Sequence, residues 1–275
     1  MRAVILTAGG TEHSYVSNAL IETLGDRVVG IVLESREASI RSALRRYGIL
    51  RVCERISTKV ERRILNHSGR QARALADVLG AVERRWPESI PIYESSSLNS
   101  AQTRALLVEL APTHLFVYGT GIVGTGTTRL AQQALNLHTG LSPWYRGSDT
   151  EFWPMYYGEP HMVGVTVHDV APAVDGGSIY ARASVQLEPG DDPFLAFARC
   201  VRLGSTLYAD IAGRLAGGEV LEPVPQDLGV GRGFRFVDRT LIHDLLMDYR
   251  VLTGRIRQQI EAADAPLPFP VRRTP

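Results

Sequence analysis

Short apolar runs alternate with amphipathic stretches along this chain. Residues 2–7 form a compact run, rich in β-branched side chains, that ends at Gly9-Gly10. Residues 12–24 place their apolar side chains on one helical face, and residues 28–33 form a second apolar run. Continuous apolar strands are typical of a parallel sheet that is covered on both faces. A strand, a glycine turn, a helix and a second strand in this order predict the start of a doubly wound α/β domain.

The same patterns predict the later elements. Further strands are expected at residues 90–93, 114–118, 134–138, 163–170 and 178–187, with a short β-like piece around 234–237. Helices are expected at residues 98–110, 194–215 and 239–261, with two or three more between residues 36 and 88. We therefore predict a Rossmann-like α/β fold over residues 1–218, with a mostly parallel sheet flanked by helices and a helical insertion at about 36–88. A short helical C-terminal extension would follow over residues 219–275.

Composition narrows the class of protein. The chain has 275 residues, of which 44% are hydrophobic and 21% charged, and its formal net charge is +1. These values are typical of a globular protein with a sizeable core, and they give no field suited to nucleic acid or a membrane surface. Two cysteines, Cys53 and Cys200, are too few for a disulfide framework or a metal cluster. No apolar run is long enough to span a bilayer, so we expect a cytoplasmic protein.

Candidate chemistry gathers where one predicted strand breaks into a loop. Asn136 and His138 are two residues apart on that strand, so their side chains point to the same face. Ligands of open α/β sheets usually bind at such strand ends. An amide beside an imidazole suits the stabilisation of a developing oxyanion. A structural pair that caps the loop is the alternative interpretation.

A carboxylate follows about forty residues later in a tight turn. Asp175 stands between apolar Val174 and the pair Gly176-Gly177. Held beside the sheet, its carboxylate would orient the imidazole and accept, directly or through water, the proton that an attacking amine loses. A simple hairpin turn is the alternative for any single Asp-Gly pair.

These residues, taken in order, resemble a known family. The blocks are Asn136-x-His138, a proline-containing loop that ends in Tyr145-Arg146-Gly147, Gly164-x-Thr166-x-His168, and Val174-Asp175-Gly176-Gly177 followed by Ile179. They resemble the catalytic domain of the 10-formyltetrahydrofolate-dependent formyltransferases, which include glycinamide ribonucleotide transformylase, methionyl-tRNA formyltransferase and the sugar-nucleotide N-formyltransferases. The resemblance is close over roughly 110–190, and weaker but collinear over 1–35 and 90–110. It implies the formyltransferase fold.

The resemblance also implies a reaction and its catalytic residues. Asn136, His138 and Asp175 match the family's triad. His138 would polarise the formyl oxygen, Asn136 would share in stabilising the tetrahedral oxyanion, and Asp175 would orient His138 and handle the proton. The amine of a small-molecule acceptor would attack 10-formyltetrahydrofolate directly, without a covalent enzyme intermediate and without a metal.

The family likeness places the two substrates as well. The folate would lie against two loops, through Val117, Tyr118, Gly119, Thr120, Gly121, Ile122, Asp169, Val170, Val174 and Gly176. The acceptor would meet Gly9, Gly10, Thr11, His13, Trp144, Tyr145 and Arg146. Glu12, in the first turn of the helix, would repel a phosphate there, which argues against glycinamide ribonucleotide as the acceptor.

Other functions stay open. Residues 221–275 hold eight Arg against seven acidic residues, too balanced for many phosphate contacts, so a methionyl-tRNA formyltransferase-like activity is a minority hypothesis. A 10-formyltetrahydrofolate hydrolase, with water in place of the amine, is a close alternative. A non-catalytic folate- or nucleotide-binding protein is disfavoured because the triad positions are filled. A dinucleotide oxidoreductase is disfavoured because the opening lacks G-x-G-x-x-G. A homodimer is compatible with the sequence.

Overall fold

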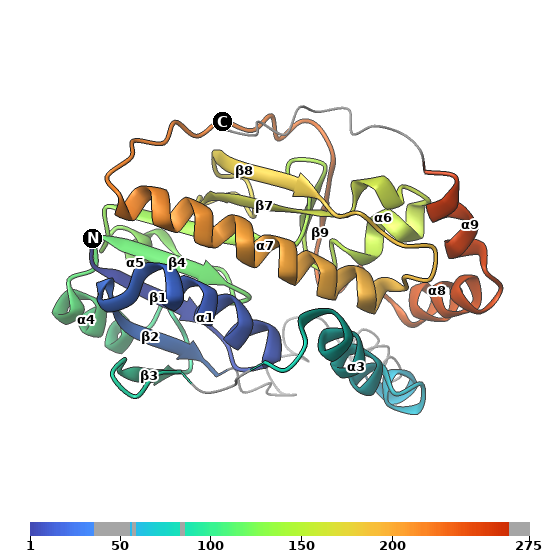
Figure 1. Cartoon of the computed structure of the whole chain (residues 1–275), viewed down its shortest axis with the longest axis horizontal. Coiled ribbons are helices and arrows are strands. Elements are labelled where there is room, and N and C mark those ends of the chain that lie inside the picture. The colour runs from blue at the N-terminus through green and yellow to red at the C-terminus, as the bar shows by residue number, and fades with distance from the viewer. Residues whose placement is uncertain (36–55, 57–58, 83–85, 264–275) are drawn as a thin grey trace.

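One twisted sheet organises the molecule. The computed structural model describes residues 1–35, 56, 59–82 and 86–263. Over these ranges seven strands form a sheet in the order β3-β2-β1-β4-β5-β7-β8 (Figure 1). The strands from β3 to β5 in this order run parallel to one another, whereas β7 pairs antiparallel with both β5 and β8. The predicted class, a mostly parallel α/β sheet flanked by helices, is therefore confirmed.

The elements have the following bounds. The strands of the sheet are β1 Ala3–Thr7, β2 Val28–Glu34, β3 Ile92–Ser95, β4 His114–Tyr118, β5 Gln133–His138, β7 Gly164–Asp169 and β8 Ile179–Ser184. The longer helices are α1 Thr11–Leu24, α3 His67–Leu79, α4 Ala101–Leu110, α7 Pro193–Ala216 and α8 Leu241–Leu252. Shorter elements are α5 Thr125–Thr128, α6 Phe152–Tyr157, α9 Arg255–Glu261 and a separate strand pair, β6 Tyr145–Gly147 with β9 Arg232–Phe234.

The central strands carry a core on each face. Along β1, Ala3 and Ile5 belong to the cluster on the side of α1 and α7, which lie across the front of the sheet in Figure 1. Val4 and Leu6 point the other way, into the cluster that includes Leu107 of α4. Alternate side chains of a strand point to opposite faces, so a strand covered on both sides must be apolar throughout. This explains the continuous apolar runs of the sequence.

Helix α7 joins two central strands of the sheet. Its N-cap is Asp192, whose side chain accepts hydrogen bonds from the backbone N–H groups of Phe194 and Leu195. The buried Tyr208 hydroxyl donates to the carbonyl of Leu135 at 2.8 Å and accepts from the N–H of Val117 at 2.9 Å. One side chain of α7 therefore ties β4 to β5, next to the end of the sheet where Asn136 and His138 lie.

Several expected elements differ in detail. The helix predicted over 239–261 is two helices, because Gly254 adopts a left-handed conformation with φ 72° between α8 and α9. The piece expected around 234–237 lies earlier, as β9, and pairs in parallel with β6, which was not predicted. Of the helices expected within 36–88, the described part contains α3 and a helical stretch at 59–64. Residues 36–55, with Cys53, lie outside the described residues, and Cys200 is buried. The division at residue 218 stays a prediction.

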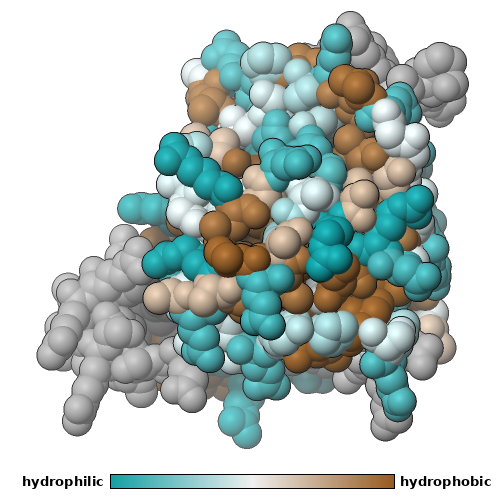
Figure 2. Space-filling model, turned by 90° about the vertical axis from the view of Figure 1, so that its left-hand side faces the viewer, coloured by the Kyte–Doolittle hydropathy of each residue, from teal (hydrophilic) through white to brown (hydrophobic). Residues whose placement is uncertain are grey.

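The surface is mixed in character. On the face turned to the viewer in Figure 2, groups of hydrophobic side chains are exposed among hydrophilic ones, mainly in the lower half. Within the described ranges, no helix has the length and apolar character that a membrane span requires.

Candidate active site

The antiparallel pairing of β5 and β7 sets the geometry of the site. Asn136 faces His168 across the two strands, and His138 faces Thr166. Directly opposed residues of an antiparallel pair project their side chains from the same face of the sheet. As a result the Nδ2 atom of Asn136 lies 3.2 Å from the Nε2 atom of His168. The strand pair thus presents an amide and two imidazoles side by side.

The turn between β7 and β8 delivers the carboxylate. Asp175 has a left-handed backbone with φ 48°, and its Oδ2 atom accepts a hydrogen bond from the N–H of Gly147 at 2.7 Å. The same oxygen lies 3.5 Å from Nδ1 of His138, and Oδ1 lies 3.5 Å from Nε2 of His168. A glycine is required at 177, since a Cβ there would lie 1.8 Å from the Asp169 carbonyl oxygen. Residues remote in sequence therefore converge on one carboxylate.

Backbone carbonyls determine which ring nitrogens carry protons. Nε2 of His138 lies 3.1 Å from the carbonyl oxygen of Tyr145, and Nδ1 of His168 lies 2.8 Å from that of Asp169. A carbonyl only accepts, so each of these nitrogens holds a proton and donates it. In the neutral rings this leaves lone pairs on Nδ1 of His138 and Nε2 of His168. The second lone pair accepts from the Asn136 amide.

Burial and charge act in opposite directions on the two partners. Burial lowers the pKa of His138, although Asp175 raises it in part. Burial by itself would raise the pKa of Asp175, but the two histidines and the Gly147 N–H outweigh burial and lower that pKa to about 2. At neutral pH the site therefore holds an ionised carboxylate beside a neutral imidazole.

A pocket of about 820 Å³ opens over these groups. Asn136, His138, His168 and Asp175 all line it. Of the residues expected to meet the folate, those that line the pocket are Val117, Tyr118, Gly119, Thr120, Gly121, Ile122, Val170 and Val174. Asp169 and Gly176 lie outside the lining; the Asp169 carboxylate instead accepts from the Tyr180 hydroxyl at 3.0 Å. The pocket has the size and the mixed lining of small-molecule sites.

The N-terminal turn contributes one of its expected residues. His13 lines the pocket and its Nδ1 atom lies 3.0 Å from the Thr7 hydroxyl, whereas Gly9, Gly10 and Thr11 lie outside the lining. A Cβ on Gly119 would lie 2.3 Å from the His13 ring, and Gly119 itself has φ 64°. The close approach of His13 to this loop thus depends on that glycine.

The loop residues expected at the acceptor are engaged elsewhere. The Trp144 ring packs under the guanidinium of Arg182 at 4.7 Å, and Tyr145 is buried. Arg146 donates to the carbonyls of Pro143 at 3.1 Å and Leu228 at 3.3 Å. None of the three lines the pocket.

Two groups of site residues were not assigned by the sequence. His168 lay in the G-x-T-x-H block, but only the strand register places it against Asn136 and Asp175. Phe234, Arg235 and Phe236 line the pocket from the C-terminal part of the chain. They reach it because β9 pairs with β6, and two strands of three residues leave no readable periodicity.

Comparison with known proteins identifies the family of the chain. The family model described as formyl transferase matches residues 2–210. The chain belongs to the formyl transferase family. This confirms the family expected from the motifs and, at the level of the family, the predicted enzyme class.

Relatives within the formyl transferase family differ in what they act on. The chain is 30% identical over 142 residues to the methionyl-tRNA formyltransferase of Koribacter versatilis (strain Ellin345), a match covering 50% of this chain and 45% of the relative. The chain thus spans less than half the length of that protein. A sugar N-formyltransferase from Shewanella sp FDAARGOS_354 shares the fold with a TM-score of 0.58 and 14% identity, covering 92% of this chain and 88% of the other.

A further structure carries ligands. WlaRD, a sugar 3N-formyl transferase solved in the presence of dTDP and 5-N-formyl-THF, has a TM-score of 0.56 at 13% identity, covering 88% of this chain and 73% of the other. At these identities the structural likeness concerns the fold alone.

Proposed function

We propose that this formyl transferase family member transfers a formyl group from 10-formyltetrahydrofolate to the amine of a small-molecule acceptor. The observation that carries the proposal is the convergence of Asn136, His138 and Asp175 at the floor of one pocket. Family membership supports formyl transfer, and the folate derivative in the WlaRD structure supports the cosubstrate.

The pocket walls suit a flat folate ring. The loop after β4, residues 119–122, and residues 170–172 and 174 all line the pocket. Ile122 and Val174 are 72% and 49% exposed, so they offer apolar surface at the pocket mouth. Burial of that surface by a bound ring would stabilise the complex. We propose that backbone groups of these loops bind the pterin edge.

The tautomers support a role for each polar group. Asn136 has a second amide hydrogen beyond the one directed at His168, and this hydrogen is free to donate to the formyl oxygen as it becomes an oxyanion. The Nδ1 lone pair of His138 accepts the proton that the attacking amine loses. The same proton then passes from Nδ1 to the folate nitrogen as the carbon–nitrogen bond breaks. Asp175 stays ionised throughout and stabilises the transient imidazolium.

The acceptor would enter from the side of the C-terminal segment. Phe234, Arg235 and Phe236 form part of the pocket wall there. Aromatic rings with a guanidinium suit an acceptor that carries a ring and negative charge. We expect an amino sugar nucleotide or another biosynthetic amine of that kind.

Turnover with an amine panel tests the proposal. Purified protein is mixed with 10-formyltetrahydrofolate, and tetrahydrofolate release is followed spectroscopically with and without each amine. Transfer predicts release that depends on the amine, together with a formamide product detected by mass spectrometry. Release that is independent of every amine would instead identify a hydrolase.

A tRNA acceptor is the second candidate, favoured by the similarity to a methionyl-tRNA formyltransferase. It is tested in the same assay by adding methionyl-tRNA. Formyl transfer to tRNA with no reaction of the small amines would overturn the preferred acceptor class but not formyl transfer itself.

A further inference from the structure

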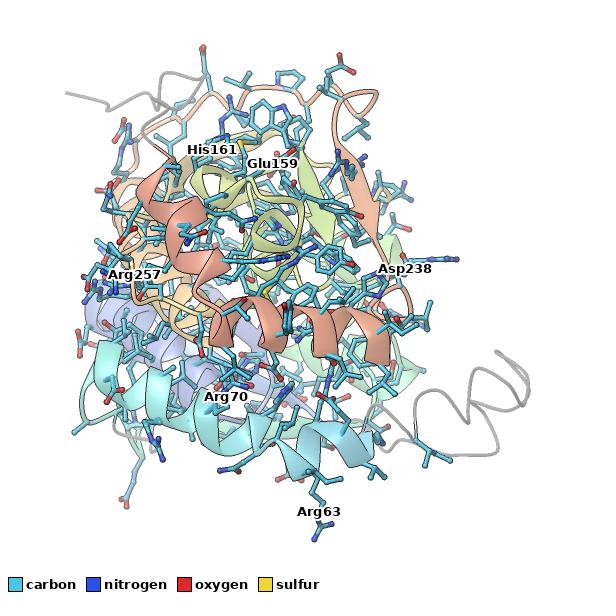
Figure 3. All side chains as sticks on the ribbon, turned by 90° about the vertical axis from the view of Figure 1, so that its right-hand side faces the viewer. Arg63, Arg70, Glu159, His161, Asp238 and Arg257 are labelled. Carbon is cyan, nitrogen blue, oxygen red and sulfur yellow. The ribbon has the colours of Figure 1, made fainter. Side chains whose placement is uncertain are left out.

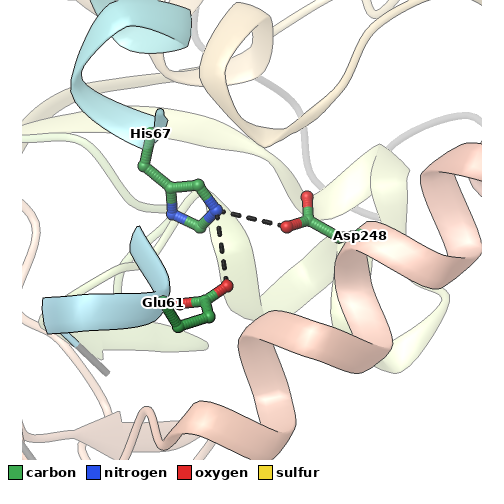
Figure 4. A group of neighbouring side chains, drawn as sticks. All are labelled: Glu61, His67 and Asp248. Atoms are coloured by element: carbon green, nitrogen blue, oxygen red, sulfur yellow. Dashed lines mark hydrogen bonds and ion pairs between the residues drawn. The ribbon is translucent and has the colours of Figure 1, made fainter. Parts of the chain in front are cut away.

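A second cluster of ionisable side chains lies away from the pocket, between the helices that follow β2 and helix α8. Glu61 comes from the helical stretch at 59–64, His67 is the first residue of α3, and Asp248 lies on α8 (Figure 4). Asn66, with a left-handed φ of 51°, interrupts the helical backbone between Glu61 and His67. That break turns the His67 ring back toward Glu61. None of the three residues lines the active-site pocket.

The three side chains meet with the spacing of metal ligands. The Nε2 atom of His67 lies 3.7 Å from Oε1 of Glu61 and 3.2 Å from Oδ2 of Asp248. All three candidate ligand atoms lie within 4.8 Å of one another. Two ligands of a tetrahedral Zn²⁺ at ordinary bond lengths lie about 3.3 Å apart. The observed spacing is therefore close to that of a coordination shell.

Glu61 supplies a second, independent indication. Its side chain is 10% exposed, yet among the described residues neither carboxylate oxygen has a hydrogen-bond partner. A buried carboxylate that accepts no hydrogen bond is costly, and a cation removes that cost. The Oε1 atom of Glu61 faces the Nε2 atom of His67 (Figure 4).

The surroundings hold the ligands in place. Arg70 donates to the other oxygen of Asp248 at 2.7 Å and approaches Asp192 at 3.3 Å; Figure 3 shows it between α3 and α8, whereas Arg63 points away from them. The Phe194 ring packs edge-on against the His67 ring with centroids 5.3 Å apart. Such outer contacts orient metal ligands.

We propose that Glu61, His67 and Asp248 form a structural site for one divalent metal ion of the Zn²⁺ type. Two carboxylates balance the charge of the ion, and the neutral imidazole supplies the nitrogen ligand that Zn²⁺ prefers over Mg²⁺. Water takes the fourth position, because the ligand side chains keep 10–15% exposure. The ion ties the helices after β2 to α8 and takes no part in formyl transfer.

The test uses the full chain, stripped with EDTA and titrated with Zn²⁺ alone. We expect one ion per chain by calorimetry, and a thermal midpoint that rises by about 5 °C at a hundredfold excess over Kd. Glu61→Gln should weaken binding at least tenfold, whereas Glu22→Gln, which removes an equal charge from an exposed position of α1, should leave it unchanged.

A Co²⁺ titration gives a second readout. The visible bands of tetrahedral cobalt should appear in the wild-type protein and disappear in His67→Gln. If the wild-type protein takes up no zinc, the cluster does not bind a metal ion and the proposal is wrong. Equal zinc affinity in Glu61→Gln and Glu22→Gln would place the ion elsewhere, for example on the active-site histidines, and would also overturn it. Both results are independent of any enzymatic assay.

Discussion

Two regions of this molecule bring histidine and carboxylate side chains together, and they differ in which of the remaining polar atoms have hydrogen-bond partners. In the active site, the backbone N–H of Gly147 donates to the Asp175 carboxylate. The carbonyls of Tyr145 and Asp169 accept from the rings of His138 and His168. In the cluster of Glu61, His67 and Asp248, two glutamate oxygens are left without a hydrogen-bond donor among the described residues. Ring nitrogens whose protonation is set by backbone partners suit proton transfer. Carboxylate lone pairs that accept no hydrogen bond suit a cation. The same residue types thus serve different chemistry according to their second partners.

The largest effect should come from the active-site imidazole. His138→Ala is expected to lower kcat about a thousandfold, because it removes both the proton acceptor and the cation next to the oxyanion. Steady-state release of tetrahydrofolate measures the change, and His161→Ala, a histidine outside the pocket lining, is the control. A variant that keeps full turnover would remove His138 from the mechanism.

Asp175→Asn should lower kcat about a hundredfold, since the transient imidazolium loses its counter-charge. It should also change stability. The folded pKa of about 2 lies below the unfolded value of 3.8, so the carboxylate contributes about 2 kcal/mol above pH 4 that is lost as the pH falls toward 2. Denaturant unfolding of wild type and variant at pH 7 and pH 3 tests this. A gap that does not narrow toward low pH would contradict the assignment.

His168 should act as a positioning residue. Its Nε2 atom accepts from the Asn136 amide, so His168→Phe releases that amide from its fixed orientation. We expect kcat to fall about tenfold with little change in KM. Steady-state kinetics of wild type and variant measure both constants, and a raised KM with an unchanged kcat would contradict a positioning role.

Another carboxyl, Glu151, is half-buried and interacts with Asp149 rather than with histidines. Burial, and then Asp149, raise the pKa of Glu151 to about 7. Folding therefore favours its protonated form, and stability falls as the pH rises from about 4.5 to 7. Glu151→Gln should exceed wild type by on the order of 2 kcal/mol at pH 8 and by much less at pH 5. Chemical unfolding at both pH values, with Glu22→Gln as the control, measures the difference. An equal gap at both values would place the titration elsewhere.

Local patterns were sufficient for much of the sheet. The apolar runs that became β1, β2, β4 and β5 were visible because both faces of these strands are covered. The common face of Asn136 and His138 followed from a period of two. Asp175 needed the family resemblance, because an Asp-Gly turn alone has no preferred partner.

What the sequence did not reveal depends on contacts between distant segments. The placement of His168 against Asn136 needs the antiparallel insertion of β7 beside β5. The pairing of β6 with β9 joins segments that are 87 residues apart and too short to show a pattern. The break at Gly254 was overlooked because the apolar periodicity continues across it.

The β6–β9 pair has a consequence for how acceptor choice can change over time. Phe234 to Phe236 form a wall of the pocket, yet they belong to a stretch of chain that supplies none of the reacting groups. This stretch is coupled to the proton-handling residues, because β9 pairs with β6, whose Gly147 N–H donates to the Asp175 carboxylate. If the wall binds the acceptor as proposed, homologues can change which amine is admitted by exchanging the side chains of residues 234–236 while the backbone pairing of β9 with β6 is kept.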